Sequence, residues 1–244
     1  MHNFNKCPRC GFPTQAAKSF SGAPSEFWLE CTNPKCNTFI NTYIPQAHQR
    51  AFHEDPHTFK GSFGGYGSGK TLTDRQQFYK HALITPGGNT IIGANVASQY
   101  EQTIKRDIEA DLPAAFVRGY NTQKQYMDLI NGHRVMYRPF DDPNKLRSYN
   151  VSMFIMIEGS EIKRESFTQL KTRLRNMAAA TQAKDPETGE PLFQLAPNGT
   201  PIPVYDHDWR EGIIESNPDA GKQFLPALKL LSNSVKTLTA YLSC

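Results

Sequence analysis

One stretch of eight residues limits what this chain can fold into more than any other feature of the sequence. Residues 64–71, GGYGSGKT, fit the pattern G-x-x-x-x-G-K-[ST]. Small residues in this pattern let successive backbone N–H groups turn inward around a phosphate at the start of a helix. Residues 58–63 before the loop have a strand-like composition, and residues 72–82 after it are rich in helix formers. The order of strand, loop and helix predicts a P-loop nucleotide site.

The P-loop also predicts which residues contact ATP and its Mg²⁺. The lysine of such a loop neutralises β- and γ-phosphate oxygens, and the hydroxyl that follows it holds the metal ion. A flexible glycine-rich turn without a ligand is the alternative, but it leaves the flanking strand and helix unexplained. The expected nucleotide-binding residues of the loop are Gly64, Gly65, Gly67, Ser68, Gly69, Lys70 and Thr71, with Thr71 also holding magnesium.

Strand-like and helix-like segments alternate after the loop. Residues 90–94 predict a buried strand, and residues 96–112 predict a helix with apolar residues at a spacing of four. Asn131-Gly132 predicts a hairpin turn, followed by a strand over residues 133–138. Alternation of this kind favours an α/β fold with a mostly parallel sheet and helices on both faces.

A P-loop ATPase also needs a carboxylate at the end of a second buried strand, where it orients and deprotonates the attacking water. Residues 151–157 are the only candidate strand, since six of the seven are apolar and Glu158 follows directly. We therefore expect Glu158 to be the catalytic carboxylate. Glu161 is either a second acid of the site or a first-turn acid of a helix expected over residues 166–183.

Two close pairs of cysteines predict a small metal-bound unit at the N-terminus. Two residues separate Cys7 from Cys10, and four separate Cys31 from Cys36. Such pairs place thiolates around a tetrahedral Zn²⁺, which stabilises short strands that cannot build a core alone. A structural zinc ribbon over residues 1–45 is the favoured interpretation, and reduced cysteines that pack as small apolar side chains are the alternative. Four thiolates leave no open position for a catalytic zinc.

Two other metal-like patterns are weak. The segment from His53 to His57 fits H-E-x-x-H, but Pro56 interrupts the helical turn that would align the two histidines. A polar linker is expected there instead. Asp206, His207 and Asp208 are adjacent in a Pro/Gly-rich segment, and three adjacent loop residues rarely converge on one ion.

Composition excludes several classes of protein. A length of 244 residues predicts one main domain and one small one. A charged fraction of 20% and the lack of an apolar run near the ~20 residues of a membrane helix argue against disorder and against a membrane span. The net charge of +4 permits a nucleic-acid partner without requiring one. No apolar signal segment opens the chain, which predicts a reducing compartment.

The chain resembles the ATPase domain of tailed-bacteriophage terminase large subunits, the motors that package viral DNA into procapsids. The resemblance covers about residues 57–220 and rests on the order of GGYGSGKT, NTIIGAN, NGHRVMYRPFDDPNKLRSYNVSMFIMIEGSEI, SFTQLKTRLRN and EGIIESNPD. It implies an ASCE-type P-loop ATPase fold. By resemblance, the Walker A site is Gly64, Gly69, Lys70 and Thr71, the catalytic acid is Glu158, and the coupling motif that senses nucleotide state is Ser216, Asn217 and Pro218.

The cysteine pairs and the resemblance together predict the domains, and the resemblance implies partners and a compartment. We expect the zinc ribbon over residues 1–45, the P-loop ATPase domain over residues 46–220 and a short tail over residues 221–244. The expected partners are double-stranded DNA, other copies of the chain in a homo-oligomeric ring, the phage portal and the small terminase subunit. The expected place of action is the cytoplasm of an infected or lysogenic bacterial host, and no membrane partner is expected.

Three features depart from the family pattern. Many members carry an arginine where this chain has Tyr66, so positive charge for the transition state would come from Lys60, Arg75 or Arg173, or from a neighbouring subunit. The usual acidic pair is reduced to Glu158.

The third departure concerns the end of the chain. The sequence ends where the family continues into a nuclease domain, so no nuclease activity is expected, and residues 222–244 contain no acidic residue, as in a truncated or foreign tail. The alternative function is accordingly a truncated, catalytically weak remnant that binds nucleotide or DNA. A zinc-ribbon helicase would need helicase motifs, which we do not find.

Overall fold

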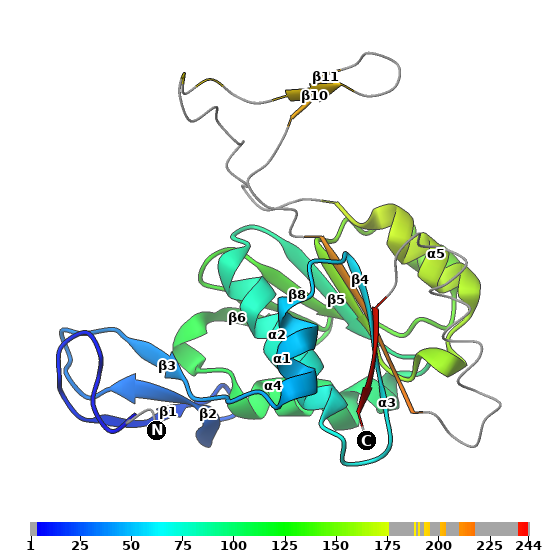
Figure 1. Cartoon of the computed structure of the whole chain (residues 1–244). Coiled ribbons are helices and arrows are strands. Elements are labelled where there is room, and N and C mark those ends of the chain that lie inside the picture. Colours follow the sequence, from blue (N-terminus) through cyan, green and yellow to red (C-terminus); the bar gives the residue numbers. More distant parts are fainter. Residues whose placement is uncertain are drawn as a thin grey trace.

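An eight-stranded sheet forms the centre of the molecule (Figure 1). The computed structural model describes residues 4–175, 188, 190, 193–195, 201–203, 210–217 and 239–243. Across the sheet the strands follow the order β13-β4-β12-β9-β5-β8-β7-β6. Their bounds are Phe59–Gly64 (β4), Asn89–Gly93 (β5), Val117–Asn121 (β6), Tyr126–Leu129 (β7), Arg134–Tyr137 (β8), Met153–Met156 (β9), Glu211–Ser216 (β12) and Thr239–Ser243 (β13).

The sheet is parallel except at one edge. Every neighbouring pair from β13 to β8 is parallel, whereas β6, β7 and β8 form an antiparallel meander. The predicted hairpin turn at Asn131-Gly132 joins β7 to β8, and Gly132 adopts a φ of +83° there. β12 comes late in the chain, yet it lies between β4 and β9. The mostly parallel α/β sheet predicted from the sequence is confirmed.

Alternate residues of the central strands belong to two apolar layers. Helices α1 (Ala47–Glu54) and α2 (Lys70–Ile84) cover one face, and α5 (Arg164–Arg173) covers the other (Figure 1). Strands covered on both faces need apolar side chains at nearly every position, which explains the continuous apolar run before Glu158. The first layer takes Ile92, Ile155 and Ile213 from the strands, and the second takes Ile91, Phe154 and Ile214.

Two predicted helices differ in the structure. The segment 96–112 is helical but interrupted, with α3 at Ala97–Tyr100, a π-helical turn at Glu101–Lys105 and α4 at Arg106–Asp111; Thr103 has non-helical dihedrals. The helix expected over residues 166–183 ends early. Leu174 is extended and pairs with Val151 just before β9, so α5 cannot continue past Arg173. Residues 176–183 lie outside the described residues.

Short elements complete the fold. The 3₁₀ turns are η2 (Ala114–Phe116), η3 (Pro143–Leu146) and η4 (Gly159–Glu161), and β10 (Phe193–Leu195) pairs antiparallel with β11 (Pro201–Pro203). Asp206, His207 and Asp208 lie outside the described residues. In the part of the chain that the structure describes, no helix is long and apolar enough to cross a bilayer.

The N-terminal ribbon is a small antiparallel sheet that packs on the main core. Its strands are β1 (Thr14–Lys18), β2 (Pro24–Cys31) and β3 (Phe39–Asn41). Trp28 belongs to the same apolar cluster as α2, with ring centroids 5.9 Å from Tyr79 and 5.3 Å from Phe116. Asp111, at the end of α4, accepts hydrogen bonds from the Ser25 hydroxyl at 2.6 Å and the Phe27 N–H at 2.9 Å. The ribbon therefore shares the core of the α/β domain rather than building its own.

Helix α1 extends into the segment His53–His57, which was expected to be a polar linker, and ends there at Glu54. Its Phe52 is buried in the main core, and Gln49 is buried beside the P-loop. The helix ends before Pro56, so His53 and His57 do not share a helical face, as the proline predicted. At the other end of the chain, residues 239–243 of the expected tail form the edge strand β13 beside β4.

Candidate nucleotide and metal sites

The P-loop connects β4 to α2 in the predicted order. Helix α2 begins at Lys70, directly after Gly69, whose φ of +80° lies in the left-handed region. A side chain at position 69 would also meet the end of the Gln49 side chain at 2.8 Å, and the positive φ favours glycine there. The first N–H groups of a helix have no helical partner, and at the end of a glycine-rich loop they are well placed to bind an anion.

Lys70 is buried, and its ammonium group lies against the loop. Its Nζ donates to the carbonyl oxygens of Gly64 at 2.7 Å and Gly65 at 2.9 Å, and to Oδ1 of Asn217 at 2.7 Å. All three acceptors are neutral. A bound phosphate would offer this ammonium group charged acceptors, which form stronger hydrogen bonds.

Glu158 lies at the end of β9, where the sequence predicted it, and its backbone is left-handed with φ +51° and ψ +55°. This conformation costs a residue with a Cβ about 1–2 kcal/mol, and such residues cluster at functional sites. The amide Nδ2 of Asn217 donates to Oε1 of Glu158 at 2.7 Å. Hydrogen bonds therefore run from Lys70 through Asn217 to Glu158. Ser216, the neighbour of Asn217, is fully buried at the end of β12.

Glu215, on β12, also belongs to the site and was missed from the sequence. Thr71 donates its hydroxyl to Oε1 of Glu215 at 2.9 Å. Burial raises the pKa of Glu215 to about 7; the Thr71 hydrogen bond and the charge of Lys70 oppose the rise, and the charge of Glu158 adds to it. Burial, and then the charge of Glu215, raise the pKa of Asp74 well above its usual value.

A cavity of about 630 Å³ opens beside these residues. Among the described residues that line it, Lys70 is the only basic one. Tyr66 lines the cavity but is 88% exposed. Glu161 lines it as well, and its carboxylate accepts a hydrogen bond from Gln99 of α3 at 2.6 Å. The volume and the P-loop residues of the lining suit a ligand of nucleotide size.

The basic residues considered as substitutes for a P-loop arginine do not line this cavity. Lys60 is buried and lies 2.6 Å from Glu211 of β12. Arg75 points toward the ribbon, with its guanidinium 5.4 Å from the ring of Phe27. Arg173 is the last residue of α5. Lys70 is therefore the one cationic side chain among the described residues that line the cavity.

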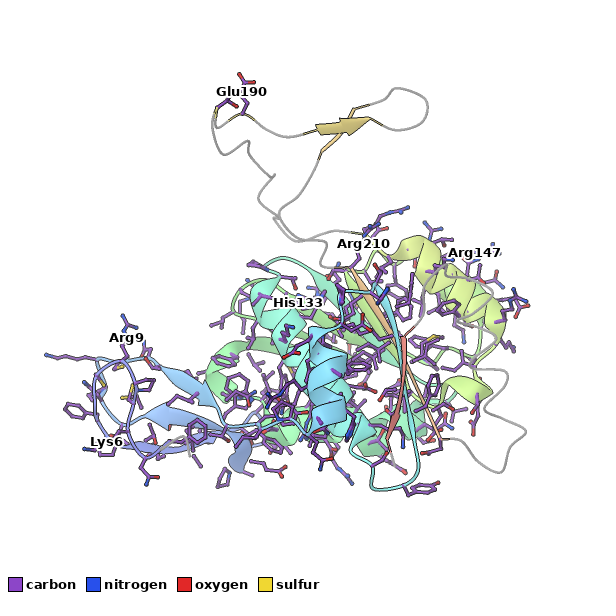
Figure 2. All side chains as sticks on the ribbon, viewed as in Figure 1. Lys6, Arg9, His133, Arg147, Glu190 and Arg210 are labelled. Atoms are coloured by element: carbon purple, nitrogen blue, oxygen red, sulfur yellow. The ribbon has the colours of Figure 1, made fainter. Side chains whose placement is uncertain are left out.

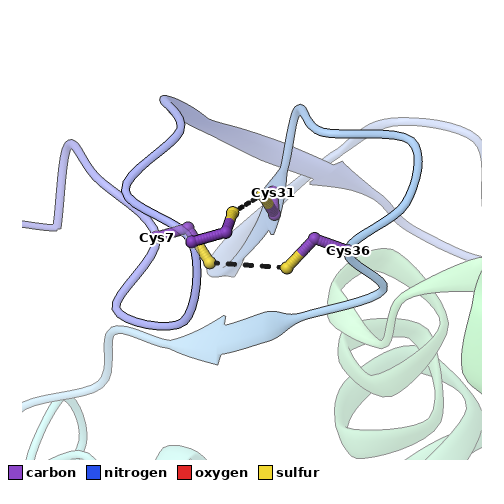
Figure 3. Close-up of side chains that lie close together, drawn as sticks. Cys7, Cys31 and Cys36 are labelled. Carbon is purple, nitrogen blue, oxygen red and sulfur yellow. Dashed lines mark hydrogen bonds between the residues drawn. The ribbon is translucent and has the colours of Figure 1, made fainter.

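The second candidate site is formed by the four cysteines of the ribbon. The sulfur atoms of Cys7, Cys10, Cys31 and Cys36 all lie within 4.8 Å of one another. The Cys7–Cys36 separation is 3.8 Å and the Cys10–Cys31 separation is 3.4 Å (Figure 3). A tetrahedral zinc with Zn–S bonds of about 2.3 Å needs sulfur separations of about 3.8 Å. The cluster therefore fits a closed tetrahedral metal site.

The cysteine cluster lies at the end of the ribbon that points away from the α/β domain. Figure 2 shows Lys6 and Arg9 at this end, and both are exposed. The two candidate sites therefore occupy different parts of the molecule.

Comparison with known proteins places the chain in a family. Residues 56–189 match the family model described as phage terminase large subunit, and this span is more than half of the 244 residues. The chain belongs to the phage terminase large subunit family. A search of curated proteins gave no match.

Solved large terminases share the fold of this terminase chain. Two crystal forms of the large terminase from a thermophilic bacteriophage align with TM-scores of 0.59 and 0.55, at 10% and 9% identity. The alignments cover 82% and 81% of this chain and 46% and 44% of the thermophilic phage's chain. The Thermus phage P74-26 large terminase ATPase domain aligns with a TM-score of 0.42 at 16% identity, over 71% of this chain and 81% of that chain. The chain thus spans about half the length of the large terminase in the first two alignments.

Most of the predicted site residues of this terminase chain lie together at the carboxyl ends of β4, β9 and β12. Gly67, Ser68, Gly69, Lys70 and Thr71 line the cavity together with Glu158 and Asn217. The sequence signal for Glu215 was its place directly before the predicted coupling motif, at the end of a short apolar strand. That signal became informative only when β12 was placed next to β4.

Proposed function

We propose that this chain is the ATP-hydrolysing motor domain of a phage terminase large subunit, which drives double-stranded DNA into procapsids. The observation that carries the proposal is the hydrogen-bonded chain from Lys70 through Asn217 to Glu158 beside a nucleotide-sized cavity. Family membership supports the same conclusion. These hydrogen bonds join a phosphate-binding cation, a coupling amide and a carboxylate, which are the three parts that a nucleotide-driven motor requires.

In this proposal the P-loop holds the phosphates of ATP. Backbone N–H groups from Gly65 to Thr71 surround the β-phosphate, and Lys70 exchanges its carbonyl acceptors for phosphate oxygens. The hydroxyl of Thr71 would hold Mg²⁺, which supplies charge neutralisation at the phosphate oxygens. Burial of Lys70 keeps competing water away and strengthens its interaction with the phosphates.

Glu158 is the proposed general base. Its carboxylate accepts a proton from the attacking water while the water oxygen bonds to the γ-phosphorus. The bond from the γ-phosphorus to the bridging oxygen breaks, and ADP and inorganic phosphate leave. Asn217 contacts both oxygens of Glu158, with its Nδ2 donating to Oε1 at 2.7 Å and its backbone N–H donating to Oε2 at 3.5 Å. Each carboxylate oxygen has two acceptor lone pairs, so the carboxylate can also accept the proton of the water.

The same amide gives a physical route from hydrolysis to motion. Lys70 donates to Oδ1 of Asn217 at 2.7 Å, so a γ-phosphate that attracts the ammonium group would compete with Asn217 for it. Loss of the phosphate restores this bond. Each cycle would thus change the contacts of Asn217 and Ser216 at the end of β12, as expected for a coupling motif.

The four cysteines are the proposed ligands of a structural Zn²⁺. Four thiolates complete the tetrahedron, so the metal would contribute stability rather than chemistry. Since the ribbon packs on α2 and α4, a bound zinc would also support the helix that begins with the P-loop.

The remaining proposals concern partners and place of action. We expect sequence-independent contact with the phosphates of double-stranded DNA, weakening as salt increases. A homo-oligomeric ring would let a neighbouring subunit supply an arginine, which the described residues that line the cavity do not include. The phage portal and the small terminase subunit are the expected packaging partners, in the cytoplasm of an infected or lysogenic host.

The test is Mg²⁺-dependent ATP turnover of the 244-residue protein with and without duplex DNA. Turnover is expected to fall about 10²- to 10⁴-fold in Glu158→Gln, the range typical of a lost general base, and to disappear in Lys70→Ala. Matched controls are Glu165→Gln and Lys145→Ala, because both side chains are exposed and outside the cavity. Turnover that survives in Lys70→Ala would refute the proposal. A parent protein that binds nucleotide without turnover, even with DNA, would favour a catalytically weak remnant.

A further inference from the structure

The nucleotide site has one acid fewer at the end of β9 than the family pattern predicts, and the structure explains why. The residue after Glu158 is Gly159, which is buried. A Cβ at position 159 would lie 2.3 Å from Cγ2 of Ile214 and 3.4 Å from the carbonyl oxygen of Glu215. Because β12 approaches so closely, no acidic side chain fits at this position. A second carboxylate must come from another element.

Glu215 is the carboxylate that the fold places where the second acid of the site is needed. It lies at the carboxyl end of β12, directly beside β4 and the P-loop that follows it. Its Oε1 accepts the hydrogen bond of the Thr71 hydroxyl at 2.9 Å. In a P-loop, the hydroxyl after the lysine is the group that contacts Mg²⁺. A carboxylate bonded to that hydroxyl is therefore next to the metal position.

The buried surroundings of Glu215 are more typical of a carboxylate that binds a cation than of a solvent-exposed acid at the end of a strand. Glu215 is 4% exposed and Asp74 is 0% exposed. Neither oxygen of Asp74, nor Oε2 of Glu215, has a hydrogen-bond partner of ordinary geometry. Buried carboxylate oxygens without partners are costly, and oxygen ligands of this kind are the ones that Mg²⁺ prefers.

We propose that Glu215 is the metal-side carboxylate of the nucleotide site, and that Glu158 keeps the water-activating role. The proposal rests on the proposed ATPase function and assigns its second acid to the strand that also carries Ser216 and Asn217. Asp74 acts behind Glu215 as a positioning residue, since it lies one turn along α2 from Thr71 and is fully buried. One strand then carries both the metal-side acid and the coupling amide.

Glu161 is the competing candidate. It lines the cavity, but it is exposed, and its contact is with Gln99 rather than with the P-loop. Substitution of each acid by its amide separates the candidates, because glutamine keeps the shape and a hydrogen-bond acceptor while removing the charge. In Glu215→Gln the acceptor for Thr71 is preserved, so a merely structural role of Glu215 would leave the metal response unchanged.

The experiment measures the affinity of the full chain for a fluorescent ADP in EDTA and in excess Mg²⁺, with Mn²⁺ binding followed by electron paramagnetic resonance in the presence of ADP. Wild type is expected to bind ADP more tightly with Mg²⁺. Glu215→Gln should keep the EDTA affinity but lose most of this gain, with Mn²⁺ affinity about 10- to 100-fold weaker. Glu161→Gln and Glu158→Gln should retain the gain.

The outcomes are distinguishable. An intact Mg²⁺ gain and intact Mn²⁺ affinity in Glu215→Gln would overturn this inference alone, and loss of the gain in Glu161→Gln or Glu158→Gln instead would reassign the metal-side acid. Wild type that binds no ADP in either buffer would overturn the proposed function, and this inference with it. Equal loss of ADP affinity in EDTA and in Mg²⁺ for Glu215→Gln would show a structural role only and would also overturn it.

Discussion

In the ribbon, four sulfur atoms from two short segments lie within 4.8 Å of one another, whereas the nucleotide site takes Lys70, Glu158 and Asn217 from three different parts of the chain. The ribbon is a three-stranded sheet, and the proposed zinc would hold the end of it that carries the cysteines. The nucleotide site is fixed by strands that are buried on both faces. The cysteine site can therefore be recognised from the spacing of the sequence alone. The nucleotide site can be recognised in full only when the order of the strands is known.

Removal of zinc is expected to have the largest effect and to act on the ribbon first. Structural zinc in small cysteine sites contributes apparent binding free energies of about 10 kcal/mol or more, which exceeds the about 3–5 kcal/mol expected from a buried tryptophan such as Trp28. The measurement is zinc content by mass spectrometry together with thermal unfolding before and after chelation. We expect one zinc per chain, loss of zinc in Cys31→Ser, and a lower melting temperature in both cases. Chelation that leaves the melting temperature unchanged would contradict a metal-dependent ribbon.

Trp28→Ala is expected to have the next largest effect, because Trp28 joins the two regions. It is 6% exposed and packs on Tyr79 of the P-loop helix. Large-to-small substitutions of buried tryptophan cost about 3–5 kcal/mol. The free energy of unfolding by urea would measure this loss. Phe12→Ala is the control, since Phe12 lies in the ribbon but is 50% exposed, and its substitution should cost less than about 0.5 kcal/mol. Equal effects of the two variants would mean that the ribbon is energetically separate from the α/β domain.

Mild acid is expected to destabilise the α/β sheet through two buried histidines that lie outside the ribbon. Burial, with smaller contributions from His133 and Lys60, lowers the pKa of His81 to about 3. Burial also lowers the pKa of His133 to about 4. Neutral His81 bonds to Ser152 at 3.0 Å, and Glu211, 3.9 Å away, is already paired with Lys60.

The direction of this pH effect depends on whether the folded or the unfolded state binds more protons. A folded pKa below the unfolded value of about 6.5 means that the unfolded chain binds more protons as the pH falls, so stability is full above pH 6.5 and decreases below it. Between pH 7.5 and 5.5 each histidine should cost about 1.4 kcal/mol. Urea unfolding of His81→Gln, which cannot gain a proton, should show a loss that is about 1.4 kcal/mol smaller than the wild-type loss over this interval. An identical pH dependence in the variant would exclude His81 as a source.

Asn41→Ala is expected to have the smallest effect and tests the polar contact between the two regions. The Asn41 amide of β3 donates to Oε1 of Gln76 on α2 at 2.9 Å. Loss of one such bond costs about 1 kcal/mol. The control is Gln15→Ala, whose bond to Glu30 is exposed and lies within the ribbon, and which should cost less than about 0.5 kcal/mol. Urea unfolding measures the free energy of unfolding of both variants. A smaller loss in Asn41→Ala than in Gln15→Ala would show that the Asn41–Gln76 bond does not stabilise the contact between the two regions.

Two helices differ from their sequence predictions because of contacts between residues far apart in the chain. The helix predicted to extend to residue 183 ends at Arg173, because Leu174 pairs with Val151. Helix α1, which the sequence did not predict, forms just before and into the expected linker because Phe52 packs in the core of the α/β domain. Val151 and the core residues around Phe52 lie more than a helical turn along the chain from Leu174 and Phe52, respectively. No local sequence pattern therefore predicts these contacts.

The sequence alone determined the P-loop, the cysteine pairs and the strand end at Glu158. In each case the physical requirement is local: a phosphate cradle needs consecutive small residues, a zinc knuckle needs close thiolates, and a buried parallel strand needs an apolar run. Only the tertiary structure decided that β12 lies between β4 and β9, which brings Glu215 to Thr71 and leaves no room for an acid at Gly159. The reason is that strand order is set by packing of both sheet faces across the whole domain, and not by the neighbours of any one residue.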